Sequence, residues 1–250
     1  MKKIFLLFLV SLVSLTAVFA QGAEESAGYT FATNANWPPL EYVDENGEIV
    51  GFEIDLIKAM SEVSGVPMDY VNTSWDTIFA GLANGQYDGI ASGVTVTEER
   101  KKTIDFSTVI YQVTQSILTK KENSDLTTPE SLFGKTVGVQ MGTTGHFAME
   151  EYPEITIKAY EDIALAIEDM INGNCDAVVC DSVIASDYVL ANENYSNMLA
   201  VTGTASDTIE DIAIAVEKGN TELLDIINTS IAALMENGTM DELYAKWNLI

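Results

Sequence analysis

The sequence predicts an α/β protein of two similarly built lobes, each with a largely parallel sheet. Short apolar strands alternate with amphipathic helices, which is typical of sheets covered by helices. A phrase of helix, Asn-Gly turn and apolar strand also occurs twice, ending once in DGIASG and once in DAVVCD. Ligands of such sheets bind beyond the carboxyl ends of the strands, so we expect both lobes to face one cleft.

In the first lobe, apolar runs bounded by turn residues predict strands over 29–33, 68–71 and 89–91. Apolar residues at helical spacing predict one helix that ends at Gly65 and a second that begins at Ser74. A DENG sequence between the first strand and the first helix is typical of a hairpin turn. Pro38 and Pro39 exclude a helix, so we expect an exposed loop that carries Trp37.

After Phe106, an extended segment rich in β-forming residues is expected to pass from the first lobe to the second. The alternation of strands and helices then begins again, with predicted strands over 135–140, 155–160 and 176–181. A polar, turn-rich connector at 203–207 is expected before an apolar strand at 209–216. Amphipathic helices from Thr221 onward close the chain.

Residues 1–20 have the pattern of a secretory signal peptide. Lys2 and Lys3 precede an apolar run, and small residues around Ala20 stand where a signal peptidase cuts. The alternative is a membrane anchor, but an interrupted apolar run of about 16 residues is short for a span. No cysteine follows the run, so we expect a protein exported to the periplasm or extracytoplasmic space without a lipid anchor.

The balance of charge excludes several classes of partner. The chain has 38 acidic and 12 basic residues and a formal net charge of −26. Nucleic-acid binding requires a basic surface, which this composition does not provide. Anionic membrane surfaces would repel the protein, and repulsion between copies favours a soluble monomer.

The cysteines and the histidine limit the chemistry of the chain. Cys175 and Cys180 flank an apolar run that is expected to be a strand. Five extended residues span roughly 16 Å, whereas the Cα atoms of a disulfide lie within about 7 Å of each other. We therefore expect two buried free thiols. His146 is the only histidine, so we expect no metal site and no Ser/His or Cys/His nucleophile. We expect no cofactor either.

Arg100 is the only arginine of the chain and follows an SGVT loop at the end of a predicted strand. A guanidinium holds a carboxylate through two hydrogen bonds, and backbone N–H groups at a strand-to-helix turn also bind anions. We therefore expect a carboxylate site here, just inside a helix start. The alternative is a salt bridge between Arg100 and Glu98 or Asp105.

Asp181 lies at a strand end of the second lobe, opposite Gly93 when the two repeated phrases are aligned on Asn-Gly. Its carboxylate would bind an ammonium, and a GTT turn begins a helix on the same wall of the cleft. Arg100 and Asp181 together would hold a zwitterion, that is, a free α-amino acid. The alternatives for Asp181 are a solvated loop carboxylate or the cap of the helix that follows.

Trp37 and Trp75 border polar loops beside the expected cleft. Their indole faces would stack on a ligand side chain or on a cation. The alternative is that both are core residues, as large aromatic side chains usually are.

Several longer phrases follow one another along the chain: WPPLEY with GEIVGFEIDLIKAM, SWDTIFAGLANGQYDGIASGVTVTEERKKTIDFS, GKTVGVQMGTTG, CDAVVCDSVIA, and the closing IAIAVEKGNTELLDIINTSIAALMENGTMDELYAKW. In these phrases the chain resembles the extracytoplasmic amino-acid-binding proteins of polar amino acid ABC uptake systems, solute-binding protein family 3. The match covers nearly the whole mature chain in the family's order. The SG-x-T-x-T-x-E-R run and the closing segment are its most specific parts.

The resemblance implies a role for each matching residue. Arg100 is similar to the family's α-carboxylate-binding arginine, assisted by the amides of Thr95 and Thr144. Asp181 resembles its α-ammonium-binding aspartate, assisted by the Gly93 carbonyl and the Thr95 hydroxyl. The implied ligand-binding set is Asn34, Trp37, Trp75, Ser92, Gly93, Thr95, Arg100, Gln140, Thr143, Thr144 and Asp181.

Asn34 and Gln140 match positions that read the ligand side chain in the family. Both are neutral amides here. They suit a polar uncharged side chain, or a hydrophobic one, better than the side chain of arginine or lysine.

The resemblance further implies the type II fold of periplasmic binding proteins, with hinge crossovers near 112–118 and 203–208 and a ligand cleft between the lobes. Lobe 1 would comprise residues 28–114 and 206–250, and lobe 2 would comprise residues 115–205. Such hinges allow the lobes to close on a ligand.

The implied function is to bind a free L-amino acid and to deliver it to a membrane-embedded ABC permease, without enzymatic activity. Two alternatives remain. A cyclohexadienyl dehydratase-like enzyme on the same fold would need a spare acid or base in the cleft, and none is found once Asp181 binds the ammonium. A soluble chemosensory protein would bind the same ligand for a separate receptor.

Overall fold

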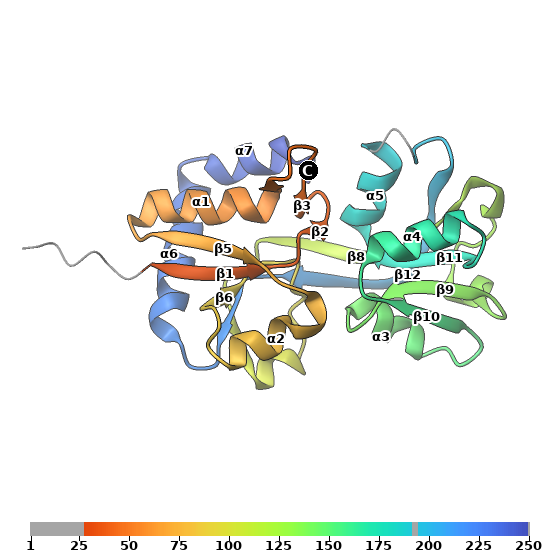
Figure 1. The fold of residues 1–250 in the computed structure, drawn as a ribbon, viewed down its shortest axis with the longest axis horizontal. Helices are drawn as coiled ribbons and strands as arrows, with labels where there is room; N and C mark the ends of the chain where they lie inside the picture. Colours follow the sequence, from red (N-terminus) through yellow and green to blue (C-terminus); the bar gives the residue numbers. More distant parts are fainter. Residues whose placement is uncertain (1–27, 192–194, 250) are drawn as a thin grey trace, which may run out of the picture.

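The computed structural model describes residues 28–191 and 195–249. The predicted signal peptide, residues 1–20, lies outside the described residues. The chain forms two lobes, each with a five-stranded sheet, and the paired strands β8 and β12 run from one lobe to the other (Figure 1). The predicted two-lobed α/β fold is therefore confirmed.

The sheet of the first lobe has the strand order β5-β1-β6-β13-β7. Strand β1 (Tyr29–Thr33) pairs in parallel with β5 (Met68–Asn72) and β6 (Gly89–Ile90). Strand β13 (Ala215–Glu217) pairs antiparallel with β6 and with β7 (Ile104–Phe106). The C-terminal part of the chain thus returns to complete this sheet.

The sheet of the second lobe has the order β10-β9-β11-β8-β12. Strand β9 (Thr136–Gln140) pairs in parallel with β10 (Thr156–Tyr160) and β11 (Ala177–Asp181). Strand β8 (Tyr111–Lys120) pairs antiparallel with β11 and with β12 (Leu199–Ile212). Strands β6 and β11 are therefore the third strand of their sheets, so the repeated phrase places equivalent strands in both lobes.

Amphipathic helices cover the sheets because each buries an apolar face. Those of the first lobe are α1 (Phe52–Ser64), α2 (Trp75–Ala83), α6 (Thr221–Glu236) and α7 (Thr239–Lys246). Those of the second lobe are α3 (Thr144–Glu150), α4 (Ile163–Ile171) and α5 (Ser182–Leu190). Helix α1 packs against α6 and α7, which ties the C-terminal part of the chain to the first lobe.

A small three-stranded sheet lies beside the first lobe and consists of β2 (Asn36–Trp37), β3 (Glu41–Val43) and β4 (Ile49–Val50). The predicted DENG turn connects β3 to β4, where the Asp44 carboxylate accepts from the backbone N–H of Asn46. The described residues also form three short 3₁₀ helices: η1 (Arg100–Lys102), η2 (Lys121–Asn123) and η3 (Pro129–Leu132).

Two local predictions are wrong. Trp37 is not in an exposed loop; it lies in β2 and is 7% exposed, because its indole packs into the apolar core.

Residues 203–207 do not form the separate connector that was predicted. They belong to the continuous strand β12, whose register against β8 shifts at several points. Backbone pairing with β8 outweighs the polar composition of this segment, and the bulges absorb the extra residues.

Cys175 and Cys180 are both free and buried, which confirms the prediction from strand geometry. In the described residues, no helix combines the length and the apolar character needed to cross a bilayer.

Gly51 brings the start of α1 close to the segment before β3, and we predict that Gly51→Ala is strongly destabilising. A Cβ atom there would lie 2.1 Å from the Leu40 carbonyl oxygen and 2.7 Å from the Glu41 nitrogen. Gly47 also has a positive φ, 84° against 139° at Gly51, but a Cβ atom at Gly47 would meet no atom within 4 Å. Because of overpacking, the free energy of unfolding measured by urea denaturation should be lowered by about 2 kcal/mol more in G51A than in G47A. Equal losses would show that the close approach is not limiting.

Candidate functional site

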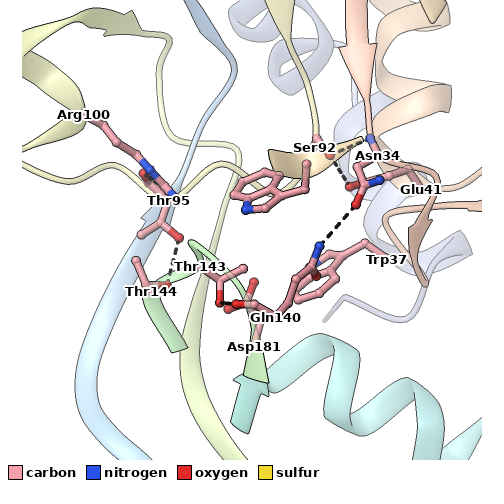
Figure 2. Close-up of a pocket in the computed structure, with 12 residues that line it drawn as sticks. Asn34, Trp37, Glu41, Ser92, Thr95, Arg100, Gln140, Thr143, Thr144 and Asp181 are labelled. Carbon is pink, nitrogen blue, oxygen red and sulfur yellow. Dashed lines mark hydrogen bonds between the residues drawn. The ribbon is translucent and has the colours of Figure 1, made fainter. Parts of the chain in front are cut away.

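One pocket lies between the lobes and contains every residue of the predicted set (Figure 2). Its lining residues are Asn34, Trp37, Glu41, Trp75, Ser92, Gly93, Thr95, Arg100, Gln140, Thr143, Thr144 and Asp181. Glu41 is the one residue of the lining that the sequence analysis did not identify. The assignment of each of these residues to ligand binding remains a prediction.

Arg100 lies at one end of the pocket, in the single turn η1 that follows the SGVT loop (Figure 2). Its guanidinium donates to the carbonyl oxygen of Thr95 at 2.9 Å and to that of Gly142 at 3.4 Å. The rings of Trp75 and Phe79 lie 5.5 and 5.0 Å from its central carbon. The group is thus held by both lobes and by two aromatic faces, which favour a cation.

The alternative of a salt bridge to Arg100 is wrong, because both candidate partners pair with lysines. Glu98 pairs with Lys101 at 2.7 Å, and Asp105 pairs with Lys218 at 2.6 Å. Burial lowers the pKa of Arg100 to about 10, although nearby carboxylates oppose this effect. Near neutral pH the guanidinium therefore carries its charge, without an ion-pair partner in the described part of the chain.

Asp181 ends β11 on the opposite wall and is only 5% exposed, which excludes a solvated loop carboxylate. Although it precedes α5, its side chain caps no backbone N–H of that helix. Its Oδ1 accepts from Nε2 of Gln115 at 2.6 Å. Burial raises the pKa of Asp181 to about 7, while hydrogen bonds from Gln115 and Trp37 oppose this shift. A ligand ammonium at this position would stabilise the ionised form.

Glu210 of β12 connects the two walls. Its Oε2 accepts from the Thr144 hydroxyl at 2.6 Å, from the Thr95 hydroxyl at 3.3 Å and from Gln115 Nε2 at 3.2 Å. The sequence analysis identified neither Glu210 nor Gln115, because only strand pairing brings them to the pocket. In that pairing, Gln115 of β8 lies opposite Asp181 of β11.

The polar groups at the other end of the pocket come from both lobes (Figure 2). Nε2 of Gln140 donates to Oδ1 of Asn34 at 3.4 Å, and Nδ2 of Asn34 donates to the Thr73 carbonyl oxygen at 3.2 Å. The Ser92 hydroxyl accepts from the backbone N–H of Asn34 at 2.9 Å. Oε1 of Gln140 is buried without a hydrogen-bond partner in the described chain, so it is an acceptor in need of a donor.

Glu41 belongs to this end of the pocket and is fully buried. Its Oε1 accepts from the Ser92 hydroxyl at 2.9 Å, while its Oε2 has no hydrogen-bond partner among the described residues. The expectation that the cleft holds no second acid besides Asp181 is therefore wrong. An acidic residue inside the otherwise apolar WPPLEYV was the signal that could have revealed it.

Glu53 of α1 lies behind the pocket and is also buried. Its Oε1 accepts from the backbone N–H of Gly93 at 2.9 Å and from the Tyr111 hydroxyl at 2.8 Å. Burial raises the pKa of Glu53 to about 7, although these two hydrogen bonds lower it. Burial and the charge of Glu53 raise the pKa of Glu41 well above its ordinary value. None of the ion pairs in the described chain involves either carboxyl.

Trp37 and Trp75 are core residues and pocket residues at once, with exposures of 7% and 8%. Gly93 has a φ of 57°, and a Cβ atom there would lie 3.4 Å from the Trp37 indole nitrogen. Glycine therefore lets the indole pack on the SGVT loop. Thr143 precedes α3, and its hydroxyl accepts from the backbone N–H of His146 at 3.3 Å.

The chain matches the family model of the bacterial extracellular solute-binding proteins, family 3, over residues 29–250. It belongs to this family. A probable histidine-binding protein of Neisseria gonorrhoeae is 32% identical over 95% of this chain and 91% of its own length. The putative ABC transporter arginine-binding protein 2 of Escherichia coli is 32% identical over 99% of both chains.

Among solved structures, an ancestral arginine-binding protein bound to glutamine has a TM-score of 0.83 and 37% identity, and the match covers 88% of this chain and 97% of that chain. These comparisons confirm the family and the fold that the sequence motifs implied. The curated relatives are named as amino-acid-binding proteins, several of them of ABC transporters, rather than as enzymes. The family as a whole acts outside the cytoplasm.

We predict that Glu53→Gln removes part of the pH dependence of stability. The pKa of Glu53 rises from 4.5 to about 7 on folding. As the pH increases, this carboxyl therefore loses its proton at a lower pH in the unfolded chain than in the folded one. Stability should fall between pH 4.5 and 7, by about 3 kcal/mol for this group.

Urea denaturation of the ligand-free protein at pH 5 and pH 8 measures this loss. It should be smaller in E53Q than in the wild type. Glu62→Gln, at an exposed position of the same helix, should keep the full loss. The same pH dependence in all three proteins would contradict the assignment.

Proposed function

We propose that this protein binds a free L-amino acid between its lobes and delivers it to a membrane-embedded ABC permease. The observation that supports this most strongly is the pairing of opposite charges across one pocket. Arg100, a guanidinium without an ion-pair partner in the described chain, faces it from the first lobe, and the buried Asp181 faces it from the second. The carboxylate and the ammonium of one α-amino acid satisfy both groups at once.

The α-carboxylate would bind to Arg100, assisted by the backbone amides of Thr95 and Thr144. The α-ammonium would bind to Asp181, which Gln115 holds in place. Since these groups come from different lobes, a bound amino acid would favour the closed arrangement over an open one. The crossover strands β8 and β12 are where the chain would bend, with lobe 1 at 28–114 and 206–250 and lobe 2 at 115–205.

The side chain of the ligand would lie toward Asn34 and Gln140, between the indoles of Trp37 and Trp75. These two amides favour a polar side chain and, taken alone, an uncharged one. The relatives are named for histidine and arginine, and one of the similar structures contains glutamine. Their names leave the side chain of this protein's ligand open.

We further infer that the protein acts as a monomer in the periplasm or extracytoplasmic space, to which residues 1–20 would direct it. The strongly acidic composition supports this, since like charges repel at a contact between copies.

Arg100→Ala should abolish tight binding, because it leaves the ligand carboxylate without its main partner. Losing one partner of such a pair costs roughly 2–5 kcal/mol, which corresponds to about 30-fold to 5,000-fold in affinity. Calorimetry with a panel of amino acids, on protein unfolded and refolded to remove any bound ligand, measures the change. Lys101→Ala, which removes the neighbouring exposed cation, should bind as the wild type does. Undiminished affinity in R100A would refute the assignment of the ligand carboxylate to Arg100.

A further inference from the structure

Glu210 of β12 reaches hydroxyl groups of both lobes. Its Oε2 lies 3.3 Å from the Thr95 hydroxyl of the first lobe and 2.6 Å from the Thr144 hydroxyl of the second. The two hydroxyl oxygens lie 3.4 Å apart, and Figure 2 shows them next to each other in the pocket. The register of β12 against β8 shifts between Ser206 and Glu210, and such an irregularity re-aims a side chain. The shift therefore lies where the strand directs Glu210 toward the pocket.

The direction of each hydrogen bond in this group follows from the protons that its members have. An ionised carboxylate accepts hydrogen bonds and donates none, whereas a hydroxyl has one proton and two lone pairs. Thr144 therefore donates its proton to Glu210 at 2.6 Å. It also accepts from Nε2 of Gln115 at 3.2 Å. The proton of Thr144 is thus used within the protein.

The amide of Gln115 supports this assignment. Its Nε2 lies 2.6 Å from Oδ1 of Asp181, 3.2 Å from Oε2 of Glu210 and 3.2 Å from the Thr144 hydroxyl. Two of these neighbours are carboxylate oxygens, so the amide presents its nitrogen to them rather than its oxygen. A donor therefore approaches Thr144 from this side, and Thr144 donates to Glu210 alone.

Thr95 is left as an acceptor toward the ligand. The hydroxyl of Thr95 has two neighbours, Oε2 of Glu210 and the hydroxyl oxygen of Thr144. Neither has a proton to give, so the proton of Thr95 points to one of them. Thr95 lines the pocket and is only 4% exposed. Its lone pairs are therefore available to a molecule in the pocket, while its proton is not.

We propose that Glu210 is a positioning residue that takes up the hydroxyl protons of Thr95 and Thr144, so that Thr95 presents an acceptor to the α-ammonium of a bound amino acid. This inference rests on the proposed amino-acid-binding function. Glu210 acts through Thr95 and does not need to touch the ligand. Without its carboxylate, the Thr95 proton is free to turn into the pocket, where it would face the protons of the ammonium.

Glu210→Met removes the acceptor and keeps the approximate length of the side chain. The ligand is whichever of the twenty L-amino acids binds the refolded wild-type protein most tightly. The second probe is the same molecule with hydrogen in place of the α-amino group, which for glutamine is glutaramic acid. E210M should bind the amino acid about tenfold more weakly, as expected for one hydrogen bond to a charged group, and the analogue as the wild type does. Calorimetry measures the first affinity and competition titration the second.

Glu210→Gln separates hydrogen bonding from charge. The amide oxygen of the glutamine takes the place of Oε2, so E210Q should keep most of the wild-type preference for the amino acid over its analogue. Asp207→Asn, at an exposed position of the same strand, should keep all of it. A mere loss of contact between the lobes would weaken the binding of both molecules alike, because both need the lobes to close.

Thr95→Val tests whether Glu210 acts through the Thr95 hydroxyl. The variant loses the hydroxyl and keeps the backbone N–H that is expected to assist Arg100. T95V should bind the amino acid about tenfold more weakly than the wild type. In the T95V background, E210M should cause little further loss, since coupled residues do not act additively.

The inference would be overturned if E210M bound the amino acid as the wild type does, or if it lost affinity equally for the amino acid and its analogue. A loss in E210Q as large as in E210M, or additive losses in the double variant, would overturn it as well. If E210M does not fold, unchanged amino-acid affinity in T95V has the same meaning. A failure of the proposed function looks different, because the wild-type protein would then bind none of the twenty amino acids.

Discussion

The antiparallel pairing of β8 with β12 is the constraint on which the pocket depends. These strands pass between the lobes and align residues that lie far apart in the sequence. The backbone of the SGVT loop and of Val96 is hydrogen-bonded to the chain at the end of β12. The N–H of Val96 donates to the carbonyl oxygen of Asp211, and the N–H of Ala213 donates to that of Val94. Gln115 and Glu210 project from the same two strands to Asp181, Thr95 and Thr144. The pair of strands β8 and β12 thus positions the walls of the pocket. The same two strands would have to bend if the lobes moved relative to each other.

The second physical feature of the site is an excess of buried carboxyl groups. Glu41 and Glu53 are both sealed from solvent without a basic partner in the described chain, and Glu53 is held by the Gly93 amide and the Tyr111 hydroxyl. Such groups cost stability unless they are protonated or meet a cation.

The sequence predicted every residue of the pocket lining except Glu41, and it also missed Gln115 and Glu210, which form hydrogen bonds to lining residues. Arg100 and Asp181 could be predicted because each follows an apolar strand of a repeated phrase, and ligands of α/β sheets bind at strand ends. Glu41 escaped notice because a single carboxylate near prolines is normally solvated, and its burial depends on packing under Ser92. The polar composition of residues 203–207 was misleading for a related reason: their partners in β8 lie far away in the sequence.

The sequence by itself determined the family, the alternation of strands and helices, and the places of Arg100 and Asp181 at the cleft, because these follow from local patterns and from motifs of fixed spacing. Only the tertiary structure decided that Trp37 is buried and that Glu210 joins both walls. It also decided that Glu41 presents an oxygen that meets no donor among the described residues. Burial and hydrogen-bond satisfaction are properties of the whole packing arrangement, and they set the charge state of a carboxyl. The charge state of a pocket carboxyl is therefore a matter of tertiary structure, whereas the places of Arg100 and Asp181 after apolar strands follow from sequence.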